Sequence, residues 1–148
     1  MIITPGERTR VNNLVVGDAD SLIALAYKND INHQRARKLA EWLLFKGYQI
    51  IYPNTAILEA VTTLKRALNL PDKAHLIVRQ YLAGAFIVEY VDETIQNKAS
   101  QLFDEKARSK KNTIFDAIVA ALAEKLEADY IFSFDSWYPK LGFRIAGE

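Results

Sequence analysis

Four acidic side chains stand where the chain passes from an apolar segment to the next element, and their positions could support chemistry. They are Asp18, Glu59, Asp116 and Asp135. Two like charges about 4 Å apart repel by roughly 4 kcal/mol at an effective dielectric constant near 20, so gathered acids need protons or cations to compensate them. Oxygen ligands without neighbouring histidine or cysteine suit Mg²⁺ or Mn²⁺. If the fold brings these acids together, we expect a divalent metal site.

Such a site usually acts on phosphate groups. A bound Mg²⁺ or Mn²⁺ polarises a phosphoryl oxygen, lowers the pKa of a bound water and holds the nucleophile in line. Two small polar residues, Asn54 and Ser133, fall on the same expected edge and could hold a metal-bound water or a phosphate oxygen. Ordinary cap and turn hydrogen bonds explain these two residues at least as well.

The segment Val15–Ala26, with the sequence VVGDADSLIALA, organises the rest of the chain. It starts with β-branched residues, becomes acidic at Asp18 and Asp20, and then turns apolar with helical spacing. This pattern predicts a buried strand that leads into a helix. Asp20 has an ordinary explanation as the N-cap of that helix. Asp18 has none, because it stands where the strand ends, at the edge where parallel α/β sheets bind ligands.

The other three acids are expected at the same edge of the sheet. Asp135 follows an apolar strand, while Glu59 and Asp116 lie in the first turns of two helices. Each acid also has a simpler explanation. The helix dipole favours an acid at Asp116 by about 0.3–1 kcal/mol, the same alternative applies to Glu59, and Asp135 can begin the turn DSWYPK. These separate explanations do not account for all the acids falling on one edge.

Strand-like and helix-like segments alternate along the chain. The expected strands are Leu14–Gly17, Gln49–Tyr52, Phe86–Val91 and Asp129–Phe134, with a last edge strand at Phe143–Ile145. The expected helices are Ser21–Lys28, His33–Lys46, Thr55–Leu68, Pro71–Leu82, Asp92–Ser109 and Thr113–Leu126. This alternation predicts a three-layer α/β fold, with a central parallel sheet of about four to five strands flanked by helices.

Composition sets further limits on the class of protein. The chain has 148 residues, no cysteine and a formal net charge of +1, and this length is typical of one domain. We expect an N-terminal arm at residues 1–13 and a single domain at residues 14–148. No apolar run approaches the roughly 20 residues of a membrane span, so we expect no membrane partner. The absence of cysteine fits a cytoplasmic protein.

Four motifs, DADSLIAL, ILEAV, FDAIVAALA and FSFD, occur in this order along the chain. Together they resemble the PIN-domain ribonucleases, and specifically the VapC-type toxins of prokaryotic toxin–antitoxin pairs. The resemblance extends from about Val15 to Arg144 and implies a PIN-like fold. The N-terminal arm is a departure, since many such toxins start almost directly on the first strand.

The resemblance assigns the acids residue by residue. Asp18 matches the family's first-strand aspartate, Glu59 its helix glutamate, Asp116 the aspartate that opens the buried helix, and Asp135 the acid after the last core strand. Ser133 stands where the family commonly has threonine or serine. Asp20 stands where members often carry serine, asparagine or aspartate, so its role is left open.

The resemblance also implies an activity and partners. It implies an endoribonuclease that depends on Mg²⁺ or Mn²⁺ and cuts single-stranded RNA by attack of water on a phosphodiester. It further implies a homodimer and a protein antitoxin of the VapB kind, whose tail blocks the acidic pocket. Two alternatives stay open: a PIN-like nuclease of RNA processing or decay without an antitoxin, and a non-catalytic module that binds metal or a partner.

RNA must be attracted despite the acids and a net charge near zero. Candidate phosphate contacts are Lys65, Arg66, Lys110 and Lys111. Each is also explained as a solvated helix end. Trp137 and Tyr138 follow the last acid closely and could stack an unpaired base, but packing of the last strand against the sheet is the favoured explanation.

Overall fold

The structure is a computed structural model that describes residues 13–147 of the chain. One sheet contains the strands β1 (Leu14–Gly17), β2 (Gln49–Pro53), β3 (Ile87–Glu89) and β4 (Tyr130–Phe132). All neighbouring strands run parallel, in the order β3-β2-β1-β4. The predicted parallel α/β fold is confirmed. Because β1 is a central strand, the residue that follows it lies in the middle of the sheet edge.

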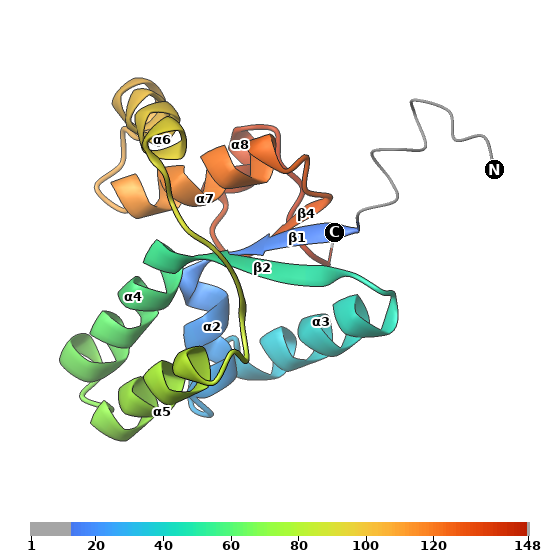
Figure 1. Ribbon diagram of the computed structural model, residues 1–148, viewed down its shortest axis with the longest axis vertical. Helices are drawn as coiled ribbons and strands as arrows, with labels where there is room; N and C mark the ends of the chain where they lie inside the picture. Colours follow the sequence, from blue (N-terminus) through green and yellow to red (C-terminus); the bar gives the residue numbers. More distant parts are fainter. Residues whose placement is uncertain (1–12, 148) are drawn as a thin grey trace.

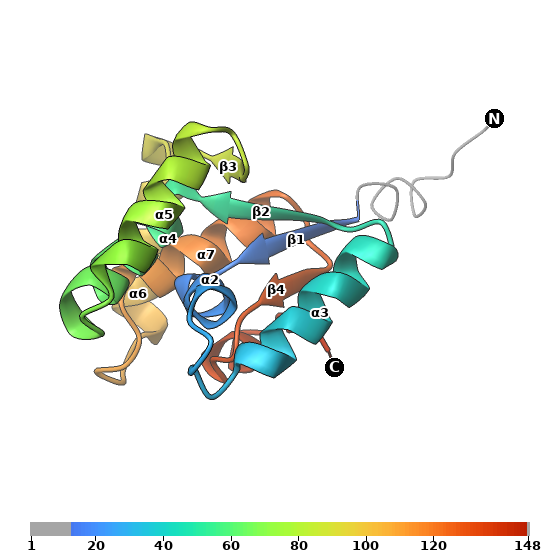
Figure 2. The ribbon, with the colours of Figure 1, turned by 90° about the horizontal axis from the view of Figure 1, so that it is seen from below.

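Helices cover both faces of the sheet (Figure 1). On one face lie α2 (Ala19–Ala26), α3 (His33–Phe45), α4 (Asn54–Thr62) and α5 (Pro71–Leu82), and on the other lie α6 (Glu93–Lys106), α7 (Ile114–Lys125) and the short α8 (Trp137–Lys140). Figure 2 shows the strands fanning out between these two layers, with β3 and β4 at opposite edges. The three predicted layers are therefore present.

The hydrophobic core centres on α7 and β1. Eight residues of α7, from Asp116 to Ala123, are buried. Val16 of β1 packs in the same cluster as α7, while Val15 packs in the cluster beneath α3, and both valines are fully buried. Full burial of a valine side chain stabilises the folded state by roughly 1.5–3 kcal/mol. Packing on both faces thus holds the end of β1 firmly against α7.

The last predicted strand, Phe143–Ile145, is reduced to a single bridge between Ile131 and Ile145. Gly142 and Gly147 flank this segment with positive φ angles of 96° and 95°. The sheet formed by the described residues therefore has four strands, which lies within the predicted range of four to five.

The helix predicted at Thr55–Leu68 changes character part-way. The α-helix ends at Thr62, and Thr63–Ala67 continue as a π-helical turn, in which the Leu68 N–H donates to Thr63 O at 3.0 Å. The Thr62 hydroxyl donates to Leu58 O at 2.8 Å. Such a bond competes with the regular helix for its carbonyl and tends to bend it.

The predicted N-terminal arm falls almost entirely on residues 1–12, which lie outside the described residues. The domain boundary at residue 13 therefore stays a prediction. Across residues 13–147, we find no helix with the length and apolar character that a membrane crossing requires.

Gly17 permits a close contact at the end of β1. A Cβ atom at this position would collide with the ring of Tyr52 from β2. The Tyr52 hydroxyl lies 3.0 Å from Ser21 Oγ in α2, so the ring cannot move away without breaking that contact.

We predict that Gly17→Ala lowers the free energy of unfolding by about 1–3 kcal/mol, the usual cost of overpacking a core. Urea denaturation monitored by circular dichroism measures this change. In a Tyr52→Leu background the same substitution should cost clearly less, and an equal cost in both backgrounds would contradict the packing argument.

Candidate metal site

Three carboxylates from distant parts of the chain meet at the carboxyl edge of the sheet. Asp18 follows β1, Glu59 lies in the second turn of α4, and Asp116 lies in the first turn of α7. Each offers one oxygen atom that lies within 4.8 Å of the oxygens of the other two. Asp18 and Asp116 are only 4% and 8% exposed. We refer to these three side chains as the acid group.

Asp18 ends the strand and starts the next helix. Its N–H donates to Phe132 O of β4 at 3.1 Å, which extends the ladder by one residue. Its Oδ1 accepts from the Ala19 N–H at 2.7 Å, so Asp18 is itself the N-cap of α2. The predicted helix start at Ser21 and the assignment of the cap to Asp20 are wrong, because β1 runs into α2 without a connecting turn.

A buried tyrosine fixes the second oxygen of Asp18. The Tyr138 hydroxyl donates to Asp18 Oδ2 at 2.6 Å. The turn predicted here is in fact the short helix α8, in which Tyr138 is fully buried and Trp137 is 7% exposed. Both rings therefore pack in the core and neither is free to stack on a base. Sequence reasoning missed the contact of Tyr138 with Asp18, although a buried tyrosine hydroxyl usually has a hydrogen-bond partner.

Asp20 joins α2 to the end of β4. Its Oδ2 accepts from Ser133 Oγ and from the Phe134 N–H, each at 2.8 Å. Ser133 is 1% exposed, and its Oγ also accepts from the Asp135 N–H at 3.1 Å, so Ser133 holds the turn after β4. The other oxygen of Asp20, Oδ1, is buried and has no hydrogen-bond partner within residues 13–147. Asp20 is not among the acids whose oxygens lie within 4.8 Å of one another.

Asp116 both joins the acid group and caps α7. The Thr113 N–H donates to Asp116 Oδ2 at 2.9 Å, and the Thr113 hydroxyl accepts from the Asp116 N–H, which together form a capping box. The simpler explanation of Asp116 as a helix-start residue is therefore correct, and it holds together with membership of the acid group.

Asp135 lies beside the acid group without joining it. Its Oδ1 accepts from the Trp137 N–H at 2.9 Å, and its Oδ2 accepts from Asn112 Nδ2 at 3.2 Å. Its charge contributes to the raised pKa values of Asp20 and Asp116, so it is close to both. A ligand role for Asp135 stays a prediction.

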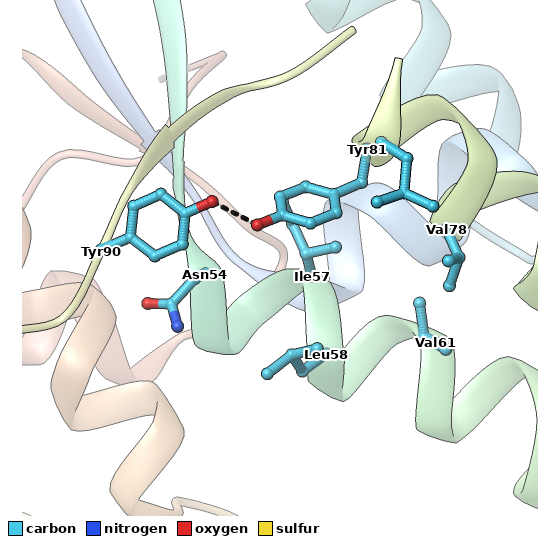
Figure 3. Close-up of a pocket in the computed structure, with 8 residues that line it drawn as sticks. Asn54, Ile57, Leu58, Val61, Val78, Tyr81 and Tyr90 are labelled. Atoms are coloured by element: carbon cyan, nitrogen blue, oxygen red, sulfur yellow. Dashed lines mark hydrogen bonds between the residues drawn. The ribbon is translucent and has the colours of Figure 1, made fainter. Parts of the chain in front are cut away.

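Asn54 is engaged elsewhere. It is the first residue of α4, with Pro53 as the N-cap, so a capping role for Asn54 is wrong. Its Oδ1 accepts from the Val91 N–H at 2.9 Å. Asn54 also lines an apolar cavity of about 200 Å³ beside α4 and α5, with Tyr81 and Tyr90, whose hydroxyls are hydrogen bonded to each other (Figure 3).

The PIN-domain family matches the sequence over residues 15–143. The chain belongs to the PIN-domain family. Among solved structures it is similar to VapC20 of Mycobacterium tuberculosis, described as a Sarcin–Ricin loop cleaving toxin, with a TM-score of 0.76 and 21% sequence identity over 87% of this chain and 95% of that chain. At this identity the likeness concerns the fold, and it confirms the predicted PIN-like architecture. Comparison with curated proteins finds no match.

Burial and mutual repulsion perturb the acids of this PIN domain. Burial raises the pKa of Asp18 well above its usual value, and the charges of Asp20 and Asp116 add to the shift. Burial also raises the pKa of Asp20 to about 6 and that of Glu59 to about 7. The pKa of Asp116 is raised for the same reason. Without a cation, this part of the PIN domain retains protons toward neutral pH.

The donors of the acid group fit a hard divalent cation. They are carboxylate oxygens alone, the ligand type that Mg²⁺ and Mn²⁺ prefer. The ion pairs formed within residues 13–147 are Arg37–Glu41, Lys98–Glu124 and Lys125–Asp92. Because none of these pairs includes the acid group, no basic side chain in that part of the chain neutralises it. A bound cation would supply the missing positive charge.

The predicted RNA contacts lie in two regions. Lys65 and Arg66 are exposed in the π-helical turn after α4, where Lys65 Nζ lies 3.2 Å from His75 Nε2. Lys110 and Lys111 are exposed in the loop between α6 and α7. This loop leads directly into the helix that carries Asp116, so its two lysines closely precede that acid along the chain.

A polar cavity of about 310 Å³ lies beside the loop between α6 and α7. It is lined by Lys106, Arg108 and Lys140, together with Ser109, Asn112, Trp137 and Leu141. Because Asn112 also donates to Asp135, this cavity adjoins the acids at the end of β4. Sequence reasoning missed these three basic residues, since only the fold brings Lys140 to Lys106.

The raised pKa values predict how stability depends on pH. The pKa is raised to about 6 for Asp20 and to about 7 for Glu59 in the folded protein. At pH values between the ordinary carboxyl pKa and these raised values, the folded metal-free protein therefore holds more protons than the unfolded chain. Its free energy of unfolding therefore falls as pH rises through this window. We predict a falling thermal unfolding midpoint from about pH 5 to about pH 8 in EDTA. Mg²⁺ or Mn²⁺ should reverse this fall by binding the ionised acids.

Glu59→Gln is the matched variant, because it preserves the shape of the side chain and removes its charge. At about pH 8 it should raise the unfolding midpoint of the metal-free protein and shrink the gain produced by Mn²⁺. If the unfolding midpoint of this variant depends on pH as in the wild type, Glu59 does not take part in the repulsion among the acids.

Tyr138→Phe tests the donor to Asp18. We predict a loss of about 1–3 kcal/mol in the free energy of unfolding, because a buried carboxylate oxygen loses its partner. The hydrogen bond also lowers the pKa of Asp18, so protons should compete better with Mn²⁺ in the variant. Titration calorimetry should find weaker Mn²⁺ binding than in the wild type near neutral pH, and a smaller loss of affinity at higher pH. Tyr130→Phe is the control and should bind Mn²⁺ like the wild type. A loss of affinity that does not depend on pH would refute the argument.

Proposed function

We propose that this PIN domain is a divalent-metal-dependent endoribonuclease that hydrolyses phosphodiester bonds in single-stranded RNA. The observation that carries the proposal is the convergence of the Asp18, Glu59 and Asp116 carboxylates, whose oxygens lie within 4.8 Å of one another in a buried site. The PIN-domain family, in which metal-dependent nucleases are typical, agrees with this chemistry.

Each acid has a role in this proposal. Asp18, Glu59 and Asp116 would hold Mg²⁺ or Mn²⁺, and Asp20 would offer beside them its Oδ1, which has no hydrogen-bond partner within residues 13–147. Such an ion, when bound, would supply polarisation of a phosphoryl oxygen and a lowered pKa of a water molecule. Asp135 adds negative charge beside these ligands and positions the loop between α6 and α7 through Asn112.

Other residues serve the metal ligands. Tyr138 fixes the orientation of Asp18 through its 2.6 Å hydrogen bond, and Thr113 does the same for Asp116. Ser133 locks Asp20 to the end of β4. These contacts hold the carboxylate oxygens in one arrangement, so little reorganisation is needed when a cation and a phosphate bind.

The basic residues outside the acid group would hold the RNA backbone. Lys110 and Lys111 stand in the loop before α7, and Lys65 and Arg66 stand roughly 9 Å further along the helix axis than Glu59. Because the net charge is only +1, attraction of RNA depends on such local groups. The cavity lined by Lys106, Arg108 and Lys140 extends the positive surface beside the loop.

We further infer that this nuclease is the toxin of a toxin–antitoxin pair in the cytoplasm, forms a homodimer, and is inhibited by a VapB-like antitoxin whose tail covers the acid group. The fold shared with VapC20, a toxin that cleaves the Sarcin–Ricin loop, supports this role. A nuclease of RNA processing would share the chemistry and differ in lacking an antitoxin. The complete acid group argues against a non-catalytic module.

Asp116→Asn should reduce cleavage of a single-stranded RNA pool by roughly 100-fold or more, the scale seen when one member of a catalytic unit is removed. It should also abolish growth arrest on expression. EDTA should stop cleavage by the wild type, and Mg²⁺ or Mn²⁺ should restore it.

Asp104→Asn, an exposed acid of α6, is the matched control and should cut RNA like the wild type. If Asp116→Asn cuts RNA as fast as the wild type, the proposed mechanism is wrong. Binding of Mn²⁺ by the wild type without any loss of RNA would favour the non-catalytic module instead.

A further inference from the structure

A further cavity, distinct from the two described above, opens beside the acid group. It has a volume of about 280 Å³ and is lined by Thr55, Leu58, Glu59, Thr62 and Phe115. The first four residues recur at helical spacing on one face of α4, and Phe115 immediately precedes Asp116 at the start of α7. Because Glu59 belongs both to this cavity and to the acid group, a ligand in the cavity would lie next to the proposed metal ligands.

The walls of this cavity select against a phosphate. No lysine or arginine lines it, and its one charged residue is acidic. Leu58 and Phe115 are 60% and 40% exposed and present apolar surface, the latter as an aromatic ring. An uncharged group with an aromatic face fits these walls better than any part of the RNA backbone.

One lining residue, Thr55, also carries a polar atom without a hydrogen-bond partner in the described part of the chain. Thr55 Oγ1 is buried and has no hydrogen-bond partner within residues 13–147. A buried hydroxyl without a partner is costly, and a ligand with a polar edge would supply one. Aromatic face and polar edge together describe a nucleobase.

We propose that this cavity receives one unpaired nucleobase of the RNA strand whose phosphate reaches the acid group. Phe115 stacks on the base, and rotation of the Thr55 side chain, which lines the cavity, brings its buried hydroxyl to the edge of the base. The proposal rests on the proposed nuclease function and adds a reason for single-strand preference, because a base must leave its pair and its stack to enter the cavity.

The volume of the cavity, about 280 Å³, suits a single planar group such as one nucleobase. The apolar cavity of Figure 3 shares Leu58 with this one but contains none of the acids. Of these two cavities, the one at Glu59 is lined by a member of the acid group.

The test combines changes in the protein with changes in the RNA substrate, in the manner of a double-mutant cycle. A short RNA cut by the wild type is prepared with an abasic residue at each position in turn, and kcat/KM is measured in Mn²⁺ for the wild type and for Phe115→Ala. For the wild type, one abasic position next to the cleaved bond should lower kcat/KM by about tenfold or more. Phe115→Ala should lower kcat/KM on the intact RNA by a similar factor and show no further loss at that position.

Two control variants sharpen this cycle. Phe115→Trp retains a stacking surface and should keep the wild-type pattern of abasic losses. Phe45→Ala removes a phenylalanine that is 85% exposed at the end of α3, away from the acid group, and should also keep the wild-type pattern.

A binding measurement provides a second readout. RNA carrying 5-iodouridine at the sensitive position is irradiated with Asp116→Asn protein, and the cross-linked peptide is identified by mass spectrometry. We expect the cross-link at Phe115. A cross-link only at residues outside the cavity would overturn the proposal.

The outcomes separate the two proposals. If the wild type cuts RNA and Phe115→Ala shows the same abasic losses as the wild type, the base site is wrong and the nuclease function stands. If Phe115→Ala changes the oligomeric state and leaves the abasic pattern intact, the cavity is a protein interface and the base site is also wrong. If the wild type cuts no RNA in Mg²⁺ or Mn²⁺, both proposals fail together.

Discussion

Repulsion among buried carboxylates is the constraint on which the rest of this structure depends. The acids are oriented by neutral donors, namely the Ala19 N–H and the Tyr138 hydroxyl for Asp18 and the Thr113 N–H for Asp116. Such donors fix the positions of the oxygens without cancelling their charge. An arginine in the same place would lower the pKa values of the acids and occupy the space of a cation. The negative charge is thus preserved for an external ion.

The parallel sheet explains how residues so distant in sequence can meet. Because β1 is central, Asp18 lies in the middle of the carboxyl edge, and α4 and α7 start on either side of it. The close contact of Gly17 with Tyr52 sets the path of the chain just before Asp18. Packing of β1 on both faces then holds this edge in a fixed position. Rigidity and the retained charge are what a metal site requires.

The sequence was sufficient to predict the fold and the meeting of three acids. Asp18 and Asp116 could be placed because each directly adjoins a long apolar run whose period is unambiguous. Glu59 could be placed because α4 begins at once after β2. Local patterns therefore carried this part of the prediction.

Contacts between distant side chains could not be predicted in the same way. The hydroxyl of Tyr138 and the orphan oxygen of Asp20 depend on where α8 and β4 settle, and no local period encodes that. Similarly, Asn54 caps nothing because Val91, far along the chain, takes its oxygen. Asp135 lies outside the acid group, and its oxygens accept from the Trp137 N–H in its own turn and from Asn112 in the loop between α6 and α7. Tertiary hydrogen bonds decided each of these cases.

The bond between Tyr138 and Asp18 also has a consequence for synthesis of the chain. It joins residues 120 positions apart. During translation, Asp18 emerges from the ribosome long before the residue that orients it. The acid group therefore takes its final arrangement only after the segment that carries Tyr138 has been made, so the nascent chain lacks a complete metal site until then.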